Sequence, residues 1–390
     1  MTAAPVITGW AHGQFGKLAE PDVETLLAGV TVSALEHAEV EAGDVDGVFV
    51  GVFNAGFSAQ GFEGGLVGVG QPSLGRVPAV HLENACATGS AALYAALDFI
   101  QSGRGRVALV AGAEKMTASA PEAVNDALLH ASYRMEEEQA GSFAAIFGQV
   151  AQEYFDRYGD HADTLARIAA KNHEHGVANP YAHLRRDLGF DFCNTVSERN
   201  PLVAGPLRRT DCSLVSDGAV ALVVTSADLV PSAPRAVSFR GRAHANDYLP
   251  LSRRGDVLEL AGAREAFGIA MTEAGTTLED LSLLETHDCF TIAELLEYEA
   301  FGLAEPGKGA TAVESGRTTR GGDLPVNLSG GLKSKGHPIG ATGVSQHIMA
   351  AMQLTGEAGD MQLPGAELAG VFNMGGVAVA NYFSVLERAR

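Results

Sequence analysis

The sequence predicts an α/β protein, because two kinds of segment alternate along it. Mostly apolar runs that end in glycine, at 45–51 and 106–112, are typical of strands buried on both faces of a sheet. Longer segments with apolar residues at helical spacing alternate with them, at 22–42 and 91–100. This alternation indicates a sheet covered by helices.

The same patterns predict the remaining elements in order. A short strand opens the chain at 6–9, and beyond residue 112 we expect helices at 143–158 and 165–175 and strands at 219–224 and 281–285. The chain should close with helices at 292–303 and 344–354 and a strand at 377–385. The glycine-rich stretch 51–75 has no GxGxxG that follows a strand and opens a helix, which argues against a dinucleotide site and predicts a mobile loop.

A change in composition divides the chain into parts. From 118 to 205 there are helical stretches without a strong strand signal, so this segment is predicted to be an inserted loop domain. Residues 1–117 and 206–234 would form one α/β half, and residues 235–390 the other. The tripeptide Ala-Thr-Gly opens a predicted buried helix in each half, at 87–89 and 341–343. We interpret this echo as a sign of two similar halves whose helix N-termini meet, which would gather Cys86 and His337 into one site.

Composition limits the classes of partner. A formal net charge of -20 over 390 residues argues against nucleic acid or an anionic membrane surface as the main partner. An anionic small molecule would need a local basic patch. The candidates for such a patch are Arg185 with Arg186, Arg208 with Arg209, Arg253 with Arg254, and Lys333 with Lys335.

Cysteine usage and the absence of targeting signals suggest a location. Cys86, Cys193, Cys212 and Cys289 have neither CxxC pairing nor metal-ligand spacing, so no metal site is predicted. Sparse, scattered cysteines fit a reducing compartment. Because there is no export signal and no apolar run of about 18 residues, we expect a cytoplasmic protein that does not enter a membrane.

Cys86 stands where a cysteine can become a nucleophile. A segment of small residues gives way at Ala91 to a buried helix, which puts Cys86 at a helix start. Free backbone N–H groups and the helix dipole favour a thiolate there, so we expect the pKa of Cys86 to fall below its usual value of about 8.5. The same amides could hold an oxyanion. The alternative is a small, buried, inert cysteine.

Three further residues are candidates for the same site: His287, Cys289 and His337. Acyl transfer through a thioester intermediate requires a cysteine, a histidine that takes its proton and a second acid/base. Each residue also has a structural alternative. His287 and Cys289 could be core residues at a strand end, and His337 could be a turn histidine fixed by Pro338.

In their order, the motifs resemble the thiolase superfamily over nearly the whole chain, and most closely the sterol-carrier-protein-2-type thiolases. Many thiolases have Asn-Glu-Ala-Phe where this chain has His287 to Phe290, and take a second cysteine from a C-terminal Cys-x-Gly where this chain has none. Its final loop, Asn373 to Gly376, departs from the family's glycine spacing. The matching motifs are 84–90, 114–116, 171–173, 211–212, 216–218, 287–290, 329–331 and 336–338.

The resemblance implies a five-layered αβαβα fold with two similar halves and an inserted loop domain. It also implies roles. Cys86 would carry the acyl group, His337 would activate it, and Cys289 would be the acid/base at the acetyl-CoA methyl carbon. His287 and His337 would form a first oxyanion hole. The amides of Cys86 and of Gly375 with Gly376 would form a second. Residues expected to contact substrate are Ser213, Phe290 and Met116, whereas Cys193 and Cys212 are expected to be structural.

The activity implied is that of a CoA-dependent thiolase, which cleaves a 3-oxoacyl-CoA with CoA or runs the reverse Claisen condensation. CoA would be a substrate or product, with no permanently bound cofactor, and the protein would be a homodimer or homotetramer. A ketosynthase-like acyltransferase is one alternative, although ketosynthases lack a counterpart of Cys289. Others are a non-catalytic lipid-binding member and a thiolase-like subunit that needs a small OB-fold partner protein.

Overall fold

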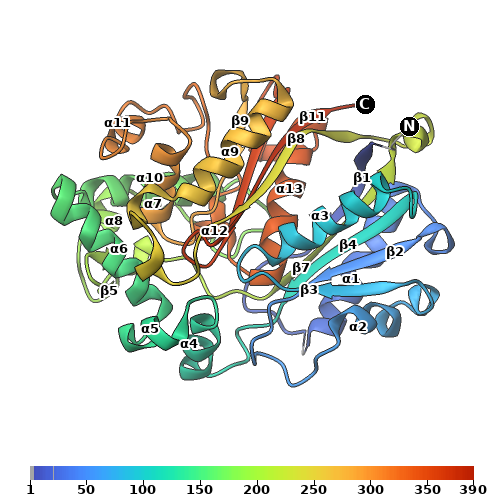
Figure 1. The fold of residues 1–390 in the computed structure, drawn as a ribbon, viewed down its shortest axis with the longest axis horizontal. Helices are drawn as coiled ribbons and strands as arrows, with labels where there is room; N and C mark the ends of the chain where they lie inside the picture. The colour runs from blue at the N-terminus through green and yellow to red at the C-terminus, as the bar shows by residue number, and fades with distance from the viewer. Residues whose placement is uncertain (1–3, 21) are drawn as a thin grey trace.

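The computed structural model describes residues 4–20 and 22–390, and nine strands in this part of the chain join into one mixed sheet. Their order across the sheet is β3-β2-β4-β7-β1-β8-β11-β10-β9 (Figure 1). The first half contributes β1 (Pro5–His12), β2 (Gly47–Gly51), β3 (Ala79–Leu82), β4 (Val107–Glu114) and β7 (Gly218–Ser226). The second contributes β8 (Val237–Asn246), β9 (Leu283–Glu285), β10 (Leu368–Gly375) and β11 (Ala380–Arg388).

The two halves repeat one strand order. In the first half the strands lie in the order β1-β7-β4-β2, and in the second half in the order β8-β11-β10-β9. In both, the strand that comes first in the chain is followed across the sheet by the half's last strand, then by the strand before the last, and then by the half's second strand. Within the described part of the sheet, the halves are linked through two residue pairs between β1 and β8, Val6 with Ser238 and Ile7 with Val237. The prediction of two similar α/β halves is therefore confirmed.

Helices form three layers around these strands. On the outside, α1 (Val23–Ala38) and α2 (Glu63–Gly70) cover the first half, and α9 (Ala261–Ala274) covers the second. Between the halves, α3 (Thr88–Gln101) packs on β2 and β4 while α13 (Ile339–Thr355) packs on β10 and β4. Because α3 and α13 also pack on each other, they form a central layer. The result is the expected five-layered αβαβα arrangement.

A helical lobe lies to one side, drawn in green in Figure 1. It consists of α4 (Pro121–Leu129), α5 (Arg134–Glu137), α6 (Phe143–Tyr158), α7 (Ala162–Gly176) and α8 (Phe190–Asn194), with a hairpin of β5 (Leu202–Ala204) and β6 (Leu207–Arg208). The helix α10 (Thr291–Ala300) packs against α6 and α7, and so attaches this lobe to the second half. Two short helices, α11 (Ala310–Glu314) and α12 (Gly331–Lys335), complete the fold.

Some local expectations need correction. The stretch 51–75 is not simply a loop, because α2 forms within it and packs against α1 and β3. The last strand begins at Ala380 rather than 377, since residues 376–379 make the turn between β10 and β11. Cys86, which was predicted to lie at a helix start, precedes Thr88, the first residue of α3, by two residues.

The Ala-Thr-Gly echo has a packing explanation. A Cβ atom on Gly89 would lie 2.8 Å from the Val344 amide nitrogen, and a Cβ atom on Gly343 would lie 2.4 Å from the Ser90 amide nitrogen. The N-terminal turns of α3 and α13 therefore touch backbone to backbone, which only glycine allows. Each half contributes one glycine to this crossing.

We expect Gly343→Ala to lower the free energy of unfolding by about 3 kcal/mol, because overpacking against rigid backbone forces the two helices apart. Its Cβ would also lie 2.4 Å from Asn373 Oδ1. Denaturant unfolding measures the change. The control is Gly268→Ala within α9, where a Cβ would meet nothing within 4 Å and alanine should stabilise the helix by up to about 1 kcal/mol. Equal effects of both substitutions would contradict the packing argument.

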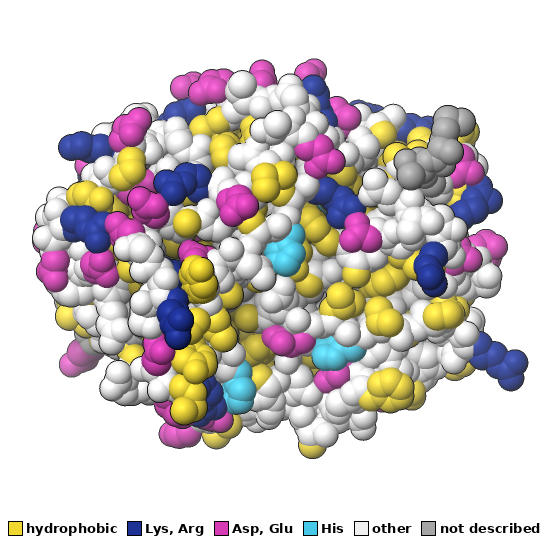
Figure 2. Space-filling model, in the orientation of Figure 1, with side chains coloured by type: hydrophobic (Ala, Val, Ile, Leu, Met, Phe, Trp, Pro, Cys, Tyr) yellow, Lys and Arg dark blue, Asp and Glu magenta, His cyan; other side chains and the backbone are white. Residues whose placement is uncertain are grey.

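Among the described residues, no helix has both the length and the apolar character needed to cross a bilayer. On the face shown in Figure 2, Lys and Arg side chains are scattered among Asp and Glu rather than gathered into one patch. This face offers no extended positive surface of the kind that binds nucleic acid.

Candidate active site

A cavity of about 190 Å³ lies beyond the carboxyl ends of β3, β4 and β9 and contains three of the four predicted catalytic residues. Cys86, Cys289 and His337 line it, together with the predicted substrate contacts Met116, Ser213 and Phe290. The fourth, His287, is fully buried behind them. The remaining wall is mostly apolar: Leu128, Phe143, Ala144, Val203, Cys212, Leu214 and Val215, with Asn125 as a polar member.

Cys86 lies in a tight turn before α3. Ala85 has a φ of 49°, a left-handed conformation that is uncommon for a residue with a side chain. The turn is closed by the Ala87 N–H, which donates to Asn84 O at 3.0 Å, and by the Thr88 N–H, which donates to Ala85 O at 3.1 Å. This turn directs the cysteine towards the start of α13, where His337 lies.

Cys86, His287 and His337 form one cluster. The echo between the halves predicted that Cys86 and His337 would meet, and His287 lies beside them. The sulfur of Cys86 and one ring nitrogen from each histidine lie within 4.8 Å of one another. The two imidazole rings meet edge to face, with their centroids 5.2 Å apart. Both Nε2 atoms are buried, and neither has a hydrogen-bond partner among the described residues. They are therefore free to act on a bound ligand or on the thiol.

The tautomer of His337 follows from its neighbours. Thr342 donates its only hydroxyl hydrogen to Pro338 O at 2.9 Å, so its oxygen must accept the bond of 2.7 Å with His337 Nδ1. The proton of the neutral imidazole is thus on Nδ1, and Nε2 carries a lone pair. Burial and the nearby Lys335 ammonium lower the pKa of His337 to about 3, so the ring is neutral at pH 7.

The expected thiolate at Cys86 is not the resting state. Burial raises the pKa of the Cys86 thiol to about 12, although hydrogen bonds from the amides of Gly376 and of Cys86 itself act in the opposite direction. The prediction from the helix dipole was wrong because burial, which leaves Cys86 only 4% exposed, outweighs the stabilising amides. Cys86 is a thiol until a base takes its proton.

We therefore expect the alkylation rate of Cys86 by iodoacetamide to rise about tenfold per pH unit from pH 7 to 10, because only the thiolate reacts and its fraction grows towards a pKa of about 12. Mass spectrometry of the Cys86 peptide measures the rate. Cys193, whose pKa burial raises to about 11, provides an internal comparison. A plateau near pH 7 would show that Cys86 is a preformed thiolate.

The amide that faces the Cys86 sulfur from the final loop is that of Gly376. Gly376 has a φ of 63°, and a Cβ there would lie 2.6 Å from Ala131 O. Gly375 lies instead against Asn84, whose carbonyl oxygen would be 2.4 Å from an added Cβ. Glycine is thus required at both positions, but for different contacts.

Asp288 ties the two histidine segments together, a role that sequence reasoning did not find. Its carboxylate accepts the backbone N–H groups of Leu332 at 2.6 Å and Lys333 at 3.1 Å, and the Asn172 amide at 2.7 Å. It therefore fixes the segment of His287 and Cys289 against α12, which leads directly to His337.

Cys289 and Ser213 are joined by the backbone. The Ser213 N–H donates to Cys289 O at 2.9 Å, so the serine borders the cavity beside the second cysteine. Burial raises the pKa of Cys289 well above its usual value, and this residue too is a thiol at rest. Cys193 packs among Ala166 and Ala169, away from the cavity, whereas Cys212 lies on the cavity wall.

Half of the basic candidates are not available to a ligand. Arg208 pairs with Asp211 at 2.9 Å, and the Lys333 ammonium donates to Cys212 O at 2.6 Å. Lys335 is 1% exposed, and the charged group of Arg254 is also buried. Each of these four therefore has an internal position. The exposed candidates are Arg185, Arg186, Arg209 and Arg253.

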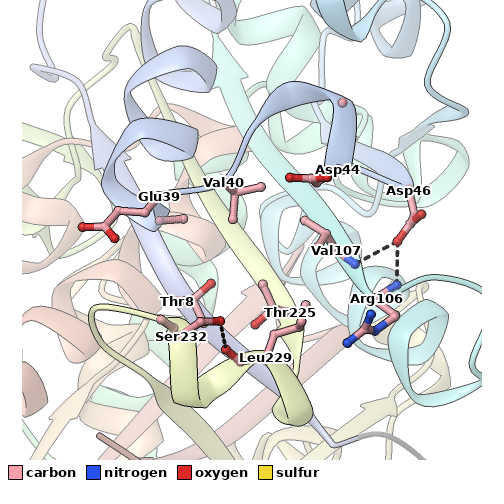
Figure 3. A pocket seen from close by; sticks show the side chains of 13 residues that line it. Thr8, Glu39, Val40, Asp44, Asp46, Arg106, Val107, Thr225, Leu229 and Ser232 are labelled. Carbon is pink, nitrogen blue, oxygen red and sulfur yellow. Dashed lines mark hydrogen bonds between the residues drawn. The ribbon is translucent and has the colours of Figure 1, made fainter.

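A second hollow, of about 500 Å³, lies at the amino ends of β2 and β4, whereas Cys86 lies at their carboxyl ends (Figure 3). Asp46 on its rim accepts the backbone N–H groups of Arg106 at 2.7 Å and Val107 at 3.1 Å. Its lining includes none of the predicted site residues. The cavity at Cys86, although smaller, is the one that gathers reactive groups.

A model of the thiolase N-terminal domain matches residues 6–228, and a thiolase C-terminal domain-like model matches residues 243–388. The chain belongs to the thiolase family. It is accordingly a thiolase-family acyltransferase, from a family that uses CoA thioesters as substrates.

Relatives of this thiolase-family protein include the acetyl-CoA acetyltransferase of Methanothermobacter thermautotrophicus. The two are 35% identical over 375 residues, which cover 95% of this chain and 96% of the relative. Human sterol carrier protein 2 is 34% identical over 315 residues, which cover 77% of this chain and 56% of that protein. The chain thus matches little more than half the length of the human relative.

Solved structures with the same fold include an Ltp2-ChsH2(DUF35) aldolase, with a TM-score of 0.82, 20% identity and coverage of 99% of this chain and 98% of the other. Human mitochondrial 3-ketoacyl-CoA thiolase in complex with CoA has a TM-score of 0.76 at 16% identity, with coverage of 100% and 98%. These similarities confirm the thiolase fold.

Proposed function

We propose that the chain is a CoA-dependent thiolase, which cleaves a 3-oxoacyl-CoA with CoA or runs the reverse condensation through an acyl group on Cys86. The observation that carries this proposal is the cluster of Cys86 with two histidines in a cavity that also contains Cys289. One cysteine can hold the acyl group while the other handles the proton on carbon.

The first half-reaction begins with transfer of the Cys86 proton to the lone pair of His337 Nε2. The thiolate attacks the 3-oxo carbonyl carbon, and the amides of Cys86 and Gly376 hold the resulting oxyanion. Collapse of this intermediate breaks the bond between C2 and C3, and the electron pair forms the enolate of acetyl-CoA. His287 and the newly protonated His337 stabilise its oxygen, and Cys289 donates a proton to C2.

The second half-reaction restores the site. The thiol of CoA gives its proton to the Cys289 thiolate and attacks the acyl group on Cys86. The second oxyanion hole again holds the tetrahedral intermediate. Its collapse releases acyl-CoA, and the Cys86 thiolate recovers its proton from His337. All protons are accounted for without an additional acid or base.

The cavity walls favour a short acyl group. Phe290 stacks on Phe147 with ring centroids 4.4 Å apart, and Phe143 lies 6.4 Å from Phe290. Phe143 and Phe290 form part of the apolar wall of the cavity of about 190 Å³, and Phe147 supports Phe290 from outside that wall.

We expect Phe143→Ala to raise kcat/KM for a longer 3-oxoacyl-CoA at least tenfold relative to acetoacetyl-CoA, because the substitution opens the apolar wall beside Phe290. Steady-state thiolysis of the two substrates gives this ratio. Leu129→Ala provides a control, since Leu129 is buried in the same core but does not line the cavity. An unchanged ratio in Phe143→Ala would place the acyl group elsewhere.

Thiolysis by the purified chain tests the proposed function. Loss of acetoacetyl-CoA and formation of acetyl-CoA with free CoA would establish a self-sufficient thiolase. No turnover, with Cys86 still acylated by acetyl-CoA, would overturn this and favour a required partner chain. The aldolase named as Ltp2-ChsH2(DUF35) contains a second component, which makes such a partner the alternative. A retro-aldol cleavage needs no acyl acceptor, however, and the intact Cys86 site favours acyl transfer.

A further inference from the structure

The side chain of Asn373 lies between two of the catalytic candidates. This residue, on β10, is fully buried. Its Nδ2 atom is 3.1 Å from Cys86 O and 2.9 Å from His287 Nδ1, and its Oδ1 accepts the Ser90 hydroxyl at 2.7 Å. No other side chain hydrogen-bonds the His287 ring among the described residues.

These contacts fix which end of the amide is which. The Cys86 carbonyl oxygen can only accept a hydrogen bond, so the Asn373 atom beside it must be the NH₂ group. One hydrogen of this group points to Cys86 O and the other to His287 Nδ1. His287 Nδ1 must then accept, and the single proton of the neutral ring is on Nε2.

We propose that Asn373 is a positioning residue, which holds His287 as an Nε2–H donor for the enolate oxygen; this inference rests on the proposed function. His337 has the opposite tautomer at rest, because Thr342 accepts from its Nδ1. The two Nε2 atoms therefore differ before the reaction begins. His337 Nε2 has a lone pair and takes the Cys86 proton, whereas His287 Nε2 already has a proton and donates a hydrogen bond. Only after the cysteine has lost its proton do both rings donate.

The same tautomer disfavours a metal ion. Cys86, His287 and His337 offer one sulfur and two nitrogen atoms within 4.8 Å of one another, ligand types that zinc accepts. A zinc ligand through Nε2 needs a lone pair there, which would place the proton on Nδ1 and set it against the Asn373 NH₂ group. Asn373 thus keeps His287 available as a donor and weakens the cluster as a metal site.

Nitrogen NMR of protein labelled with [15N]histidine tests this directly, with His287→Ala to assign the signals. In the wild-type chain we expect protonated Nε2 and unprotonated Nδ1 at His287. A proton on Nδ1 would overturn the proposal without need of any variant. Ser90→Ala is the control, because Cys86 O still orients the amide and the tautomer should not change.

Asn373→Asp replaces the donor by an acceptor of the same shape. We expect the proton of His287 to move to Nδ1. The rate of thiolysis should fall by about 10²-fold or more, because a hydrogen-bond donor to the enolate is lost. Zn²⁺ should bind at least about tenfold more tightly. Isothermal titration with ZnCl₂ measures the last effect. An unchanged tautomer and unchanged Zn²⁺ affinity in folded protein would overturn the proposal.

The tautomer and Zn²⁺ results do not depend on turnover. If the wild-type chain has Nε2–H at His287 but no thiolysis activity, the proposed function fails while the effect of Asn373 on His287 stands. If thiolysis proceeds with the His287 proton on Nδ1, the proposed function stands while the effect of Asn373 on His287 fails.

Discussion

Cys86→Ala is expected to lower the rate of thiolysis of acetoacetyl-CoA by about 10⁵-fold or more, since residues that act as one catalytic unit lose nearly all activity when the nucleophile is removed. No other described cysteine can replace it: Cys193 is buried elsewhere, and Cys212 and Cys289 are on other parts of the cavity wall. Steady-state thiolysis followed by product analysis measures the loss.

Two variants complete this test. Cys193→Ala removes a buried cysteine away from the cavity and should retain activity within a factor of about two. Cys86→Ser keeps the shape of the site but offers a much weaker nucleophile, so it should remain folded and nearly inactive. If Cys86→Ala kept a tenth of the wild-type rate, cleavage would not proceed through an acyl-cysteine, and a retro-aldol type of reaction would become the better hypothesis.

The sequence predicted the sheet well because buried strands have a simple pattern. Runs such as 106–112 and 219–224 are almost wholly apolar, and they form β4 and β7 in the centre of the first half. The helix at 143–158 was predicted with the bounds that α6 has. Its apolar residues recur at helical spacing, and Gly159 ends it.

Elements without such a pattern were missed. The helix α2 contains four glycines, which by themselves favour a loop, and it forms because it packs against α1 and β3. The helix α9 has a mixed surface and was not identified. In both cases tertiary packing outweighs local preference.

The site was predictable as a set of residues but not as an arrangement. Sequence motifs singled out Cys86, His287, Cys289 and His337, and three of them line one cavity with the fourth behind it. The tautomers depend on Thr342, five residues from His337, and on Asn373, which no local pattern connects with His287. Asn373 is 287 residues from Cys86 in the chain, and only the folded structure places its amide between the cysteine and a histidine.

The direction of the Cys86 pKa was also beyond sequence reasoning. The helix dipole acts over the first turn, but desolvation depends on everything that surrounds the sulfur. A raised pKa gives His337 a definite task, since a thiol that is not ionised at pH 7 must lose its proton during the attack. In the proposed mechanism, the base for sulfur, His337, is therefore distinct from the acid for carbon, Cys289.

Cys289→Ala should separate the two half-reactions. We expect acylation of Cys86 by acetyl-CoA to stay within about tenfold of wild type, as measured by the mass of the intact protein. His337 and the amides of Cys86 and Gly376 are untouched, and CoA can leave as a thiolate without the proton that Cys289 would otherwise give it. Thiolysis and condensation should fall by about 10²- to 10⁴-fold, the usual contribution of a general acid or base. The acyl-enzyme would then form from a simple thioester but not from carbon–carbon cleavage.

His337→Ala is the matched comparison, because its loss removes the base for Cys86 and should slow both steps together. Cys289→Ala should therefore slow thiolysis but not acylation of Cys86, whereas His337→Ala should slow both. Equal loss of acylation and thiolysis in Cys289→Ala would mean that Cys289 supports the nucleophile rather than the carbon acid. In that case the proton on C2 would have to come from one of the two imidazoles, and the division of tasks between the cysteines would be wrong.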